Sequence, residues 1–307
     1  NIENLTMLVR NQEEEEKINY ERSINRKIIY KLNKNIITSS NYEKTIKESQ
    51  LIVLAVPSSS IKNNLEKINK FLSKDQIIIS AIKGFEQDSK KTISQYLIEK
   101  TNIDKKNIGV ISGPNISIEI YNGLPATAVI GIDKSLEEKI RKLFNSEKFR
   151  AYSSNDILGI EIGGVLKNIF AIGAGIIQEY KLGTNSMASY ITRSLNEMKN
   201  IIIFFGGEEK TIFGNSGLGD LITTCFNQNS RNNQLGSLLA QGRNIELAKK
   251  EIKGTIEGIN STKIIKEILE KEKIEAPIIN EIYEVLFNNK SPKIGINDLL
   301  SREDSKE

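Results

Sequence analysis

A single lysine lies in the middle of an apolar, glycine-rich run that reads EIGGVLKN and continues as IFAIGAG. On a predicted helix, Lys167 shares one nearly smooth face with Gly163, Gly164 and Ala171. Glycine costs a helix about 1 kcal/mol relative to alanine, so this face must admit a close neighbour, either another backbone or a ligand. A buried ammonium needs an anionic partner or loses its proton. Lys167 is therefore a candidate for proton transfer, although a lysine that reaches water past a helix contact fits the same run.

Two later segments carry groups that could complete such a site. GNSGLGDLITTC places Asp220 before an apolar run, either as an ordinary helix N-cap or as the partner of a buried lysine. SRNNQLG places Ser230 at a helix N-cap and Arg231 and Asn232 in the first turn, with Gly242 closing the helix. Free backbone N–H groups and an arginine fork there suit a phosphate or a carboxylate. Because arginine in a first turn opposes the helix dipole, the anion site is favoured over a structural role.

Other polar candidates follow predicted strands. Lys83 comes after the run QIIISAI, and SGPNIS places Gly113 and Asn115 after another apolar run. Ligands of open α/β sheets bind beyond the carboxyl ends of the strands, so these residues point to one crevice. Each also fits an ordinary turn from strand to helix, with Asn115 or Ser117 as the helix cap.

Composition narrows the chemistry. The 307 residues include no histidine and one cysteine, Cys225, so a proton donor must be Lys, Asp, Glu, Tyr or Cys. We expect no metal site and no internal disulfide. The net charge of +4 comes from evenly scattered lysines, and we expect no nucleic acid partner. Without a signal peptide or an apolar run approaching about 20 residues, a cytoplasmic protein with no membrane insertion is expected.

The order of elements predicts two domains. Residues 1–155 alternate apolar strands with helices, which indicates a parallel sheet with helices on its faces. The run 50–58 reads as a strand buried on both faces. Residues 156–307 are expected to form an all-α domain packed against the first. The expected strands are 5–10, 50–58, 76–84, 107–114, 127–132 and 149–154, and the expected helices of the second domain are 157–178, 186–205, 232–241, 256–271 and 278–287.

The whole series of motifs resembles the bacterial NAD(P)-dependent glycerol-3-phosphate dehydrogenases. The matching segments occur in the order and at the spacing of that family: AVPS, AIKGFE, SGPNIS, GLPATAV, EIGGVLKNIFAIGAGI, ITRSLNEM, GLGDLITTC, SRNNQLG and GTIEG. The resemblance implies a Rossmann-type domain followed by a helical domain. It also implies reduction of dihydroxyacetone phosphate to sn-glycerol 3-phosphate by NADPH or NADH, which feeds glycerophospholipid synthesis, and a homodimer.

The resemblance assigns roles by position. Lys167 corresponds to the catalytic lysine, and Asn115 stands where the family usually has serine. Arg10 favours NADPH over NADH, because an arginine at the end of the second strand accommodates a 2′-phosphate and no acidic residue occurs before Glu13. The implied substrate contacts are Lys83, Gly113, Asn115, Asp220, Ser230, Arg231 and Asn232, and the implied cofactor contacts are Arg10, Lys83, Ser117, Arg231, Thr255 and Glu257.

One family feature has no counterpart in this sequence. The family opens with a strand and a glycine-rich phosphate loop, whereas the first glycine here is Gly84. We therefore expect a fragment or a mis-started reading of a longer protein, truncated at the first strand of the Rossmann-type domain. Two alternatives stay open: a non-enzymatic or inactive phosphometabolite-binding fragment, and a related reductase of hydroxyacids or ketopantoate. The set of Lys167, Asp220 and Arg231 argues against the first, and the phosphate clamp of SRN argues against the second.

Overall fold

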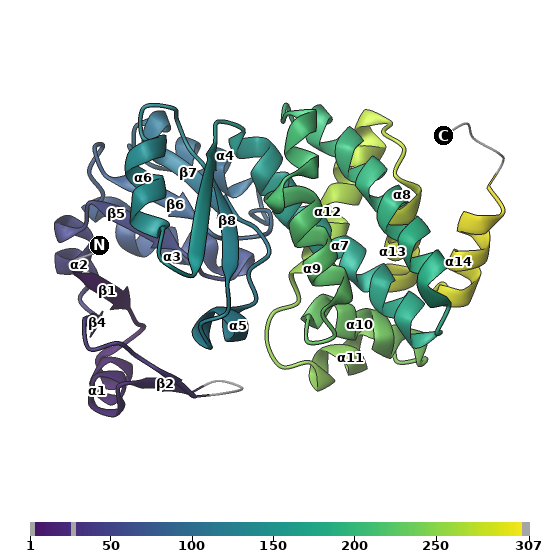
Figure 1. The fold of residues 1–307 in the computed structure, drawn as a ribbon, viewed down its shortest axis with the longest axis horizontal. Coiled ribbons are helices and arrows are strands. Elements are labelled where there is room, and N and C mark those ends of the chain that lie inside the picture. Colours follow the sequence, from purple (N-terminus) through teal and green to yellow (C-terminus); the bar gives the residue numbers. More distant parts are fainter. Residues whose placement is uncertain (1–3, 26–28, 303–307) are drawn as a thin grey trace.

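The computed structural model describes residues 4–25 and 29–302 of the chain. It forms an α/β domain of Rossmann type followed by an all-α domain, side by side along the long axis of the molecule (Figure 1). In the described part of the chain, the last strand ends at Ser154 and only helices follow. The predicted fold class is thereby confirmed.

The main sheet has five strands in the order β5-β6-β7-β8-β9. Four of them were located by their apolar runs: β5 (Leu51–Leu54), β6 (Ile77–Ser80), β7 (Ile108–Ser112) and β9 (Phe149–Ser154). The fifth, β8 (Ala126–Gly131), was also expected, but it runs antiparallel to β7, so the prediction of a parallel sheet is wrong at this pair. Alternation of strands and helices gives no signal for the direction of a single strand.

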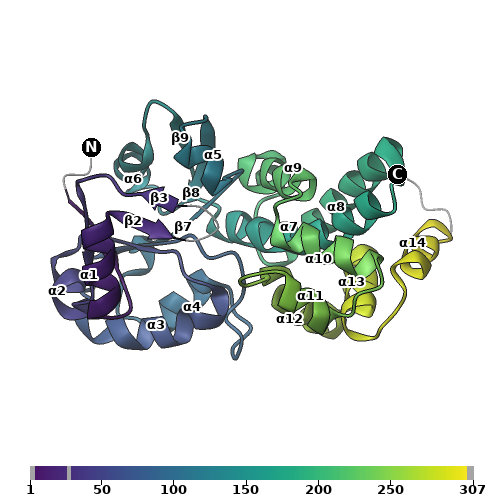
Figure 2. The same cartoon turned by 90° about the horizontal axis from the view of Figure 1, so that it is seen from below.

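Helices cover both faces of this sheet (Figure 2). Ile78 of β6 belongs to a core cluster with α3 (Ile61–Ile68) and α4 (Ile93–Lys100). Ile79 belongs to a second cluster with α6 (Glu137–Phe144), because neighbouring side chains of a strand point to opposite faces. All of β6 is therefore buried. At the end of the sheet, β5 leaves Val53 46 % exposed, which corrects the expectation of a strand buried on both faces.

Two short strand pairs lie before the main sheet. β1 (Leu5–Leu8) pairs in parallel with β4 (Ile36–Ser39), and β2 (Ser23–Asn25) pairs with the antiparallel β3 (Ile29–Lys31). Only β1 was predicted from the sequence. The three-residue β2 and β3 are too short for a periodic pattern, and β4 was missed although it is as long as β1. The helices of this region are α1 (Gln12–Glu21) and α2 (Tyr42–Glu48), and α5 (Ser117–Tyr121) follows β7.

The helical domain is built around α7 (Ile157–Glu179) (Figure 1). Its N-cap is Asp156, whose side chain accepts the N–H of Gly159. Five predicted helices are present, and the shorter α9, α11 and α14 were not among the segments expected. The helices that follow α7 are α8 (Gly183–Phe204), α9 (Asp220–Phe226), α10 (Arg231–Ala240), α11 (Ile245–Glu251), α12 (Glu257–Glu272), α13 (Pro277–Phe287) and α14 (Pro292–Leu300).

Two glycines of α7, Gly163 and Gly175, admit another backbone. A Cβ on Gly175 would lie 2.0 Å from the carbonyl oxygen of Asn233 in α10, and a Cβ on Gly236 would lie 1.8 Å from that of Ile172. The two helices therefore cross at a distance that only glycine permits. Gly164 differs, because its missing Cβ would meet the Ser112 hydroxyl at 2.8 Å and the Lys83 side chain at 3.5 Å. This one glycine makes room for polar groups beside Lys167.

By length and composition alone, α7 is the one described helix that could cross a membrane. This corrects the expectation that no apolar run approaches that length. Its most apolar 18-residue window is 100 % buried inside the protein, which is the setting of a core helix.

Candidate active site

Two lysines share one buried carboxylate where the two domains meet. The Nζ of Lys167 lies 2.5 Å from Oδ1 of Asp220, and the Nζ of Lys83 lies 2.6 Å from Oδ2. The side chains are 10 %, 23 % and 1 % exposed for Lys167, Lys83 and Asp220. The expectation that Asp220 partners a buried Lys167 is confirmed, and the alternative of a lysine reaching water is not.

Three elements bring these groups together. Lys167 lies near the middle of α7, Lys83 follows β6, and Asp220 is the first residue of α9. A Cβ on Gly163 would lie 2.9 Å from the carbonyl oxygen of Ser216, so this glycine lets the π-helical turn before Asp220 pack on α7. Gly219 holds the N-cap position of α9, so the reading of Asp220 as an N-cap is wrong.

Hydroxyl and carbonyl groups hold the cluster in place. Lys167 also donates to Oγ1 of Thr224 at 2.9 Å, and that hydroxyl donates to the carbonyl of Asp220 at 2.7 Å. The Ser112 hydroxyl donates to Oδ2 of Asp220 at 3.3 Å, and Lys83 donates to the carbonyl of Gly113 at 3.3 Å. Sequence reasoning missed Ser112 and Thr224. Thr224 could have been found, because it lies one helical turn after Asp220 and so faces the same side of α9.

Burial and charge act in opposite directions on this cluster. Burial lowers the pKa of Lys167 to about 8, and the charge of Lys83 adds to that effect, while Asp220 opposes it. Burial also opposes ionisation of Asp220, but the two ammonium groups together hold its pKa below the usual value. Asp220 is thus a carboxylate, and Lys167 can give up and regain a proton close to physiological pH.

A chain of carboxamide hydrogen bonds extends from this cluster to α10 and α12. Asn168 donates to the backbone carbonyl of Lys83 at 3.3 Å, and Asn232 donates to Oδ1 of Asn168 at 3.0 Å. The N–H of Gly258 donates to Oδ1 of Asn232 at 2.9 Å. Asn232, expected to bind substrate, therefore faces α7 and ties the start of α10 to the lysine cluster. Asn168 was missed, although it is the neighbour of Lys167 in the sequence.

The start of α10 matches the predicted layout. Ser230 holds the N-cap position, but within the described residues its hydroxyl makes no capping hydrogen bond. Arg231 is exposed, and Nη1 of its guanidinium lies 2.8 Å from where a Cβ on Gly254 would be. Gly254 has a φ of +102°, which favours glycine. The arginine fork thus lies over the turn that leads through the half-buried Thr255 into α12.

Two further candidates follow β7. Asn115 is half-buried and donates to the carbonyl of Thr127 at 2.7 Å. Ile116 is the N-cap of α5, so the expectation that Asn115 or Ser117 caps this helix is wrong. Ser117 is the first residue of α5 and is exposed.

Two cofactor candidates remain, Arg10 and Glu257, of which Glu257 lies beside Gly84, the residue after Lys83. Arg10 is exposed and pairs with Glu14 at 3.5 Å. It follows β1, which lies at the far end of the α/β domain from α9 (Figure 1). Glu257 begins α12 and accepts hydrogen bonds from Ser58, which follows β5. Sequence reasoning gave no signal for Ser58.

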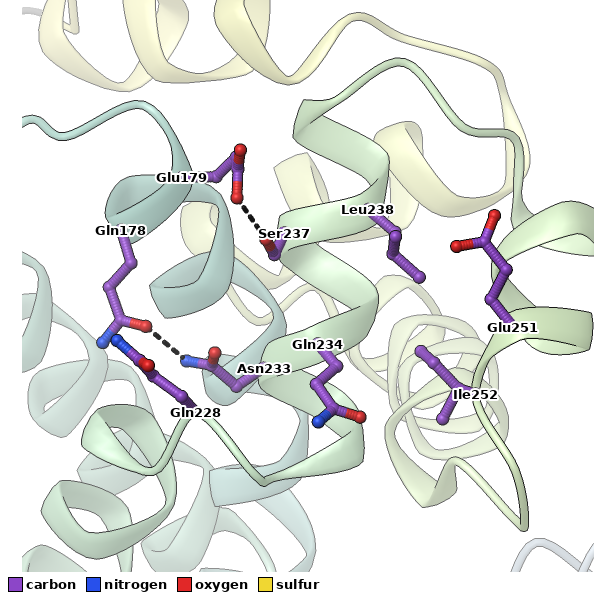
Figure 3. Close-up of a pocket in the computed structure, with 9 residues that line it drawn as sticks. All are labelled: Gln178, Glu179, Gln228, Asn233, Gln234, Ser237, Leu238, Glu251 and Ile252. Carbon is purple, nitrogen blue, oxygen red and sulfur yellow. Dashed lines mark hydrogen bonds between the residues drawn. The ribbon is translucent and has the colours of Figure 1, made fainter.

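A hollow of about 420 Å³ lies elsewhere in the helical domain (Figure 3). It contains none of the lysine–aspartate cluster. Its lining residues are Gln178, Glu179, Gln228, Asn233, Gln234, Ser237, Leu238, Glu251 and Ile252. Among the residues that the structure describes, no three His, Cys, Asp or Glu side chains gather in a way that could hold a metal ion.

Comparison with known proteins gives one consistent result. The N-terminal family model of NAD-dependent glycerol-3-phosphate dehydrogenase matches residues 1–137, and the C-terminal model matches residues 156–297. A glycerol-3-phosphate dehydrogenase [NAD(P)+] of Halothermothrix orenii is 35 % identical over 307 residues, covering 98 % of this chain and 89 % of the relative. Its counterpart in Fusobacterium nucleatum is 36 % identical over 273 residues, covering 89 % and 82 %.

Solved structures agree with the fold. The glycerol-3-phosphate dehydrogenase of Coxiella burnetii superposes with a TM-score of 0.90 at 25 % identity, over 97 % of this chain and 92 % of that one. A ketopantoate reductase of Ralstonia eutropha gives a TM-score of 0.56 at 12 % identity, over 95 % and 91 %. The second likeness is one of fold alone.

Proposed function

Because this chain belongs to the NAD-dependent glycerol-3-phosphate dehydrogenase family, we propose that Lys167 is the residue that transfers the proton in its reaction. The chain is an NAD(P)-dependent oxidoreductase that reduces dihydroxyacetone phosphate to sn-glycerol 3-phosphate, as the names of its curated relatives indicate. Neither a hydroxyacid reductase nor a binding protein without activity is favoured by these relatives. The observation that carries the proposal is the buried Lys167–Asp220–Lys83 cluster.

The cluster accounts for the proton step. A bound nicotinamide cofactor supplies the hydride to the carbonyl carbon of the substrate. Lys167 donates a proton to the carbonyl oxygen as negative charge develops there, and accepts it in the reverse reaction. Lys167 donates two of its three N–H groups to Asp220 and Thr224, so the third N–H group is available to the substrate. Lys83 adds positive potential at the same place.

The exposed start of α10 suits the substrate phosphate. Arg231 and the N–H groups of the first turn offer charge and hydrogen-bond donors to one anion. Through Asn232 and Asn168 this helix start is linked by hydrogen bonds to the backbone of Lys83. Binding of the phosphate would thereby position the carbonyl group near the lysines. Gly113, Asn115 and Ser230 complete the proposed substrate side.

The residues present fit a dinucleotide phosphate in part. Arg10 and Arg231 are exposed cations, and Ser117 is an exposed hydroxyl, all of which suit phosphate oxygens. Thr255 lies in the turn under Arg231. Both carboxylate oxygens of Glu257 already accept from Ser58, so Glu257 meets a cofactor only through its remaining lone pairs. Lys83 completes the proposed cofactor contacts.

The reaction is tested by NADPH oxidation after addition of dihydroxyacetone phosphate to the purified chain. Oxidation that depends on both the phosphate-bearing substrate and Lys167 supports the proposal. Glycerone without its phosphate is the matched control, because it cannot engage Arg231. No NADPH oxidation at saturating NADPH, or equal oxidation by the Lys167→Ala variant, would contradict the proposal.

The pH dependence of turnover follows from the lowered pKa of Lys167. Reduction requires the protonated amine, so kcat should be constant at lower pH and fall as the pH rises past about 8. Oxidation of sn-glycerol 3-phosphate requires the neutral amine, so its kcat should rise over the same interval. Profiles of kcat in both directions check this, and two profiles that change in the same sense would rule out Lys167 as the shared acid and base.

Cofactor preference is tested at Arg10. Its side chain is 84 % exposed and its pair with Glu14 is worth little at such exposure, so the guanidinium is free for a 2′-phosphate. We expect Arg10→Ala to raise KM for NADPH about 10- to 100-fold, the worth of one charge-assisted hydrogen bond, and to leave KM for NADH nearly unchanged. Lys17→Ala, on the exposed side of α1, is the control. Equal changes for both cofactors would remove Arg10 from the 2′-phosphate site.

We also propose the division into residues 1–155 and 156–307, a cytoplasmic location and a homodimer. The division is supported by the end of the last described strand at Ser154 and by the capping of α7 by Asp156. The single cysteine suits a reducing compartment such as the cytoplasm, and burial of α7 supports the absence of membrane insertion. The homodimer rests on the family resemblance, and sedimentation of the purified chain tests it.

A further inference from the structure

Two glutamates of the helical domain each hold one serine of the α/β domain in the same geometry. Glu257 at the start of α12 accepts the N–H of Ser58 at 3.0 Å and its hydroxyl at 2.5 Å. Glu161 in α7 accepts the N–H of Ser94 at 2.9 Å and its hydroxyl at 2.6 Å. Both serines are 2 % exposed. We call these two contacts the glutamate–serine clamps.

The first clamp packs against the segment that carries Lys83, and the second holds the helix to which this segment leads. A Cβ on Gly84 would lie 2.6 Å from Cβ of Ser58 and 2.9 Å from Oε2 of Glu257, so the first clamp packs directly against the residue after Lys83. Farther along, Phe85 forms a β-bridge with Thr92, and the N–H of Glu86 donates to the carbonyl of Lys91. This narrow loop leads straight to Ser94 and the second clamp.

The second clamp also serves the start of α4, because Glu161 accepts the N–H of Ser94, the second residue of that helix. Thr92 already caps α4, and Gln95 completes a capping box with it. Glu161 is only 4 % exposed, and its burial raises its pKa in spite of the hydrogen bonds from Ser94. Burying a carboxylate costs free energy unless hydrogen bonds and a helix dipole offset it. A buried carboxylate such as Glu161, on the same helix as Lys167, indicates that the position of α4 relative to α7 has to be fixed.

We propose that Glu161 and Glu257 are positioning residues that, through Ser94 and Ser58, hold Lys83 on Asp220. The inference rests on the proposed function, because it concerns the same lysine cluster. Lys83 is the most exposed member of that cluster and is attached to the other domain from Lys167. Without the clamps the ammonium of Lys83 can turn to water. Lys167 is then the one cation of the cluster that remains paired with Asp220.

Release of Lys83 has a defined effect on Lys167. The groups that face Lys167 are Asp220, Lys83 and the thiol of Cys225. Burial raises the pKa of this thiol, so the thiol is neutral. Lys83 is the one that disfavours the protonated form of Lys167 by its charge. When Lys83 moves away, Lys167 holds its proton more tightly, and the fall of kcat for reduction shifts to higher pH.

The kinetic test compares Glu257→Gln, Glu161→Gln, Ser58→Ala and Ser94→Ala, with Ser59→Ala as the control because Ser59 is the exposed neighbour of Ser58. We expect the glutamate variants to lower kcat about 10- to 100-fold, as misplacement of a catalytic group does, with a smaller change in KM for dihydroxyacetone phosphate. The fall of kcat for reduction at alkaline pH should shift to higher pH. Within each clamp, the double variant should be no worse than the glutamate variant alone.

A second readout is independent of turnover. Labelling of amines with acetic anhydride at a series of pH values, read by mass spectrometry, follows the titration of Lys83 and Lys167 one by one. In folded clamp variants Lys83 should label faster and Lys167 should need a higher pH than in the unaltered chain. If the unaltered chain fails to reduce dihydroxyacetone phosphate, the proposed function is wrong, while the labelling still decides on the clamps.

Either of two results would overturn the positioning role of Glu161 and Glu257. Unchanged labelling of both lysines in folded variants, or a kcat profile identical to that of Ser59→Ala, contradicts the positioning role. If the glutamate variants do not fold, the serine variants decide, because each removes one hydroxyl and leaves the backbone N–H bond to glutamate in place.

Discussion

Lys167→Ala lowers kcat for reduction of dihydroxyacetone phosphate by about 10²- to 10⁴-fold, the loss expected when a positioned proton donor is removed. The fold should survive, because Asp220 keeps Lys83 as its partner, together with the hydroxyl of Ser112. KM for the substrate should change less than kcat, since the proposed phosphate contacts on α10 are untouched. Steady-state kinetics with NADPH, together with a thermal unfolding curve, measure both parts of the expectation.

Two comparisons make this result specific. Lys167→Arg keeps a cation beside Asp220, but guanidinium does not release its proton near neutral pH, so we expect it to be nearly as inactive as the alanine variant. Lys266→Ala removes another lysine with a mostly buried side chain, one paired with Glu270 on α12, and should leave kcat unchanged. Full activity of either Lys167 variant would show that another group provides the proton.

The sequence was sufficient for those parts of the site that depend on long, regular elements. The 23 residues of α7 form one apolar run, so Lys167 was conspicuous within it, although a lysine that reaches water fitted the same run. A buried ammonium requires a carboxylate, and Asp220 stood at the start of another apolar run. In the α/β region, strands such as β6 consist almost wholly of isoleucine, which is typical of a sheet covered on both faces.

What the sequence did not predict depends on contacts between distant segments. Ser58 and Glu257 are 199 residues apart, and each is ordinary in its own surroundings. The same holds for Ser94 and Glu161. The antiparallel direction of β8 is likewise set by how the chain returns to the sheet, and not by the residues of the strand. Short pairs such as β2 and β3 have too few residues for any periodic signal.

Asn168 and Asn232 show how position in the sequence can mislead. Both flank residues of the proposed chemistry, Lys167 and Arg231, and Asn232 was expected to bind substrate. In the structure the two side chains bind each other and the backbones of Lys83 and Gly258. The lysine cluster, the helix start at Arg231 and the start of α12 are thus joined by hydrogen bonds. A preassembled arrangement of this kind needs little reorganisation when charge develops on the substrate oxygen.

Asp220→Asn should damage both activity and stability. It leaves two ammonium groups around a neutral amide, and one of them, Lys167, is nearly buried. Loss of one partner from a buried ion pair typically costs about 3–5 kcal/mol. With its counter-charge gone, the pKa of Lys167 falls further below its value in the unaltered chain, so the amine is neutral at pH 7 and kcat for reduction should fall at least about 10²-fold.

The pH dependence of stability distinguishes this cause from a general loss of packing. Unfolded lysine binds a proton up to a pH of about 10.4, whereas buried Lys167 in the Asp220→Asn variant does not, so the unfolded state binds more protons in between. The variant should therefore become more stable as the pH rises from 7 to 10, which denaturant unfolding at several pH values measures. Asp298→Asn, at a half-exposed pair with Lys290, should cost no more than about 1 kcal/mol. If the Asp220→Asn variant loses the same unfolding free energy at every pH, unpaired charge on Lys167 is not the cause of the loss.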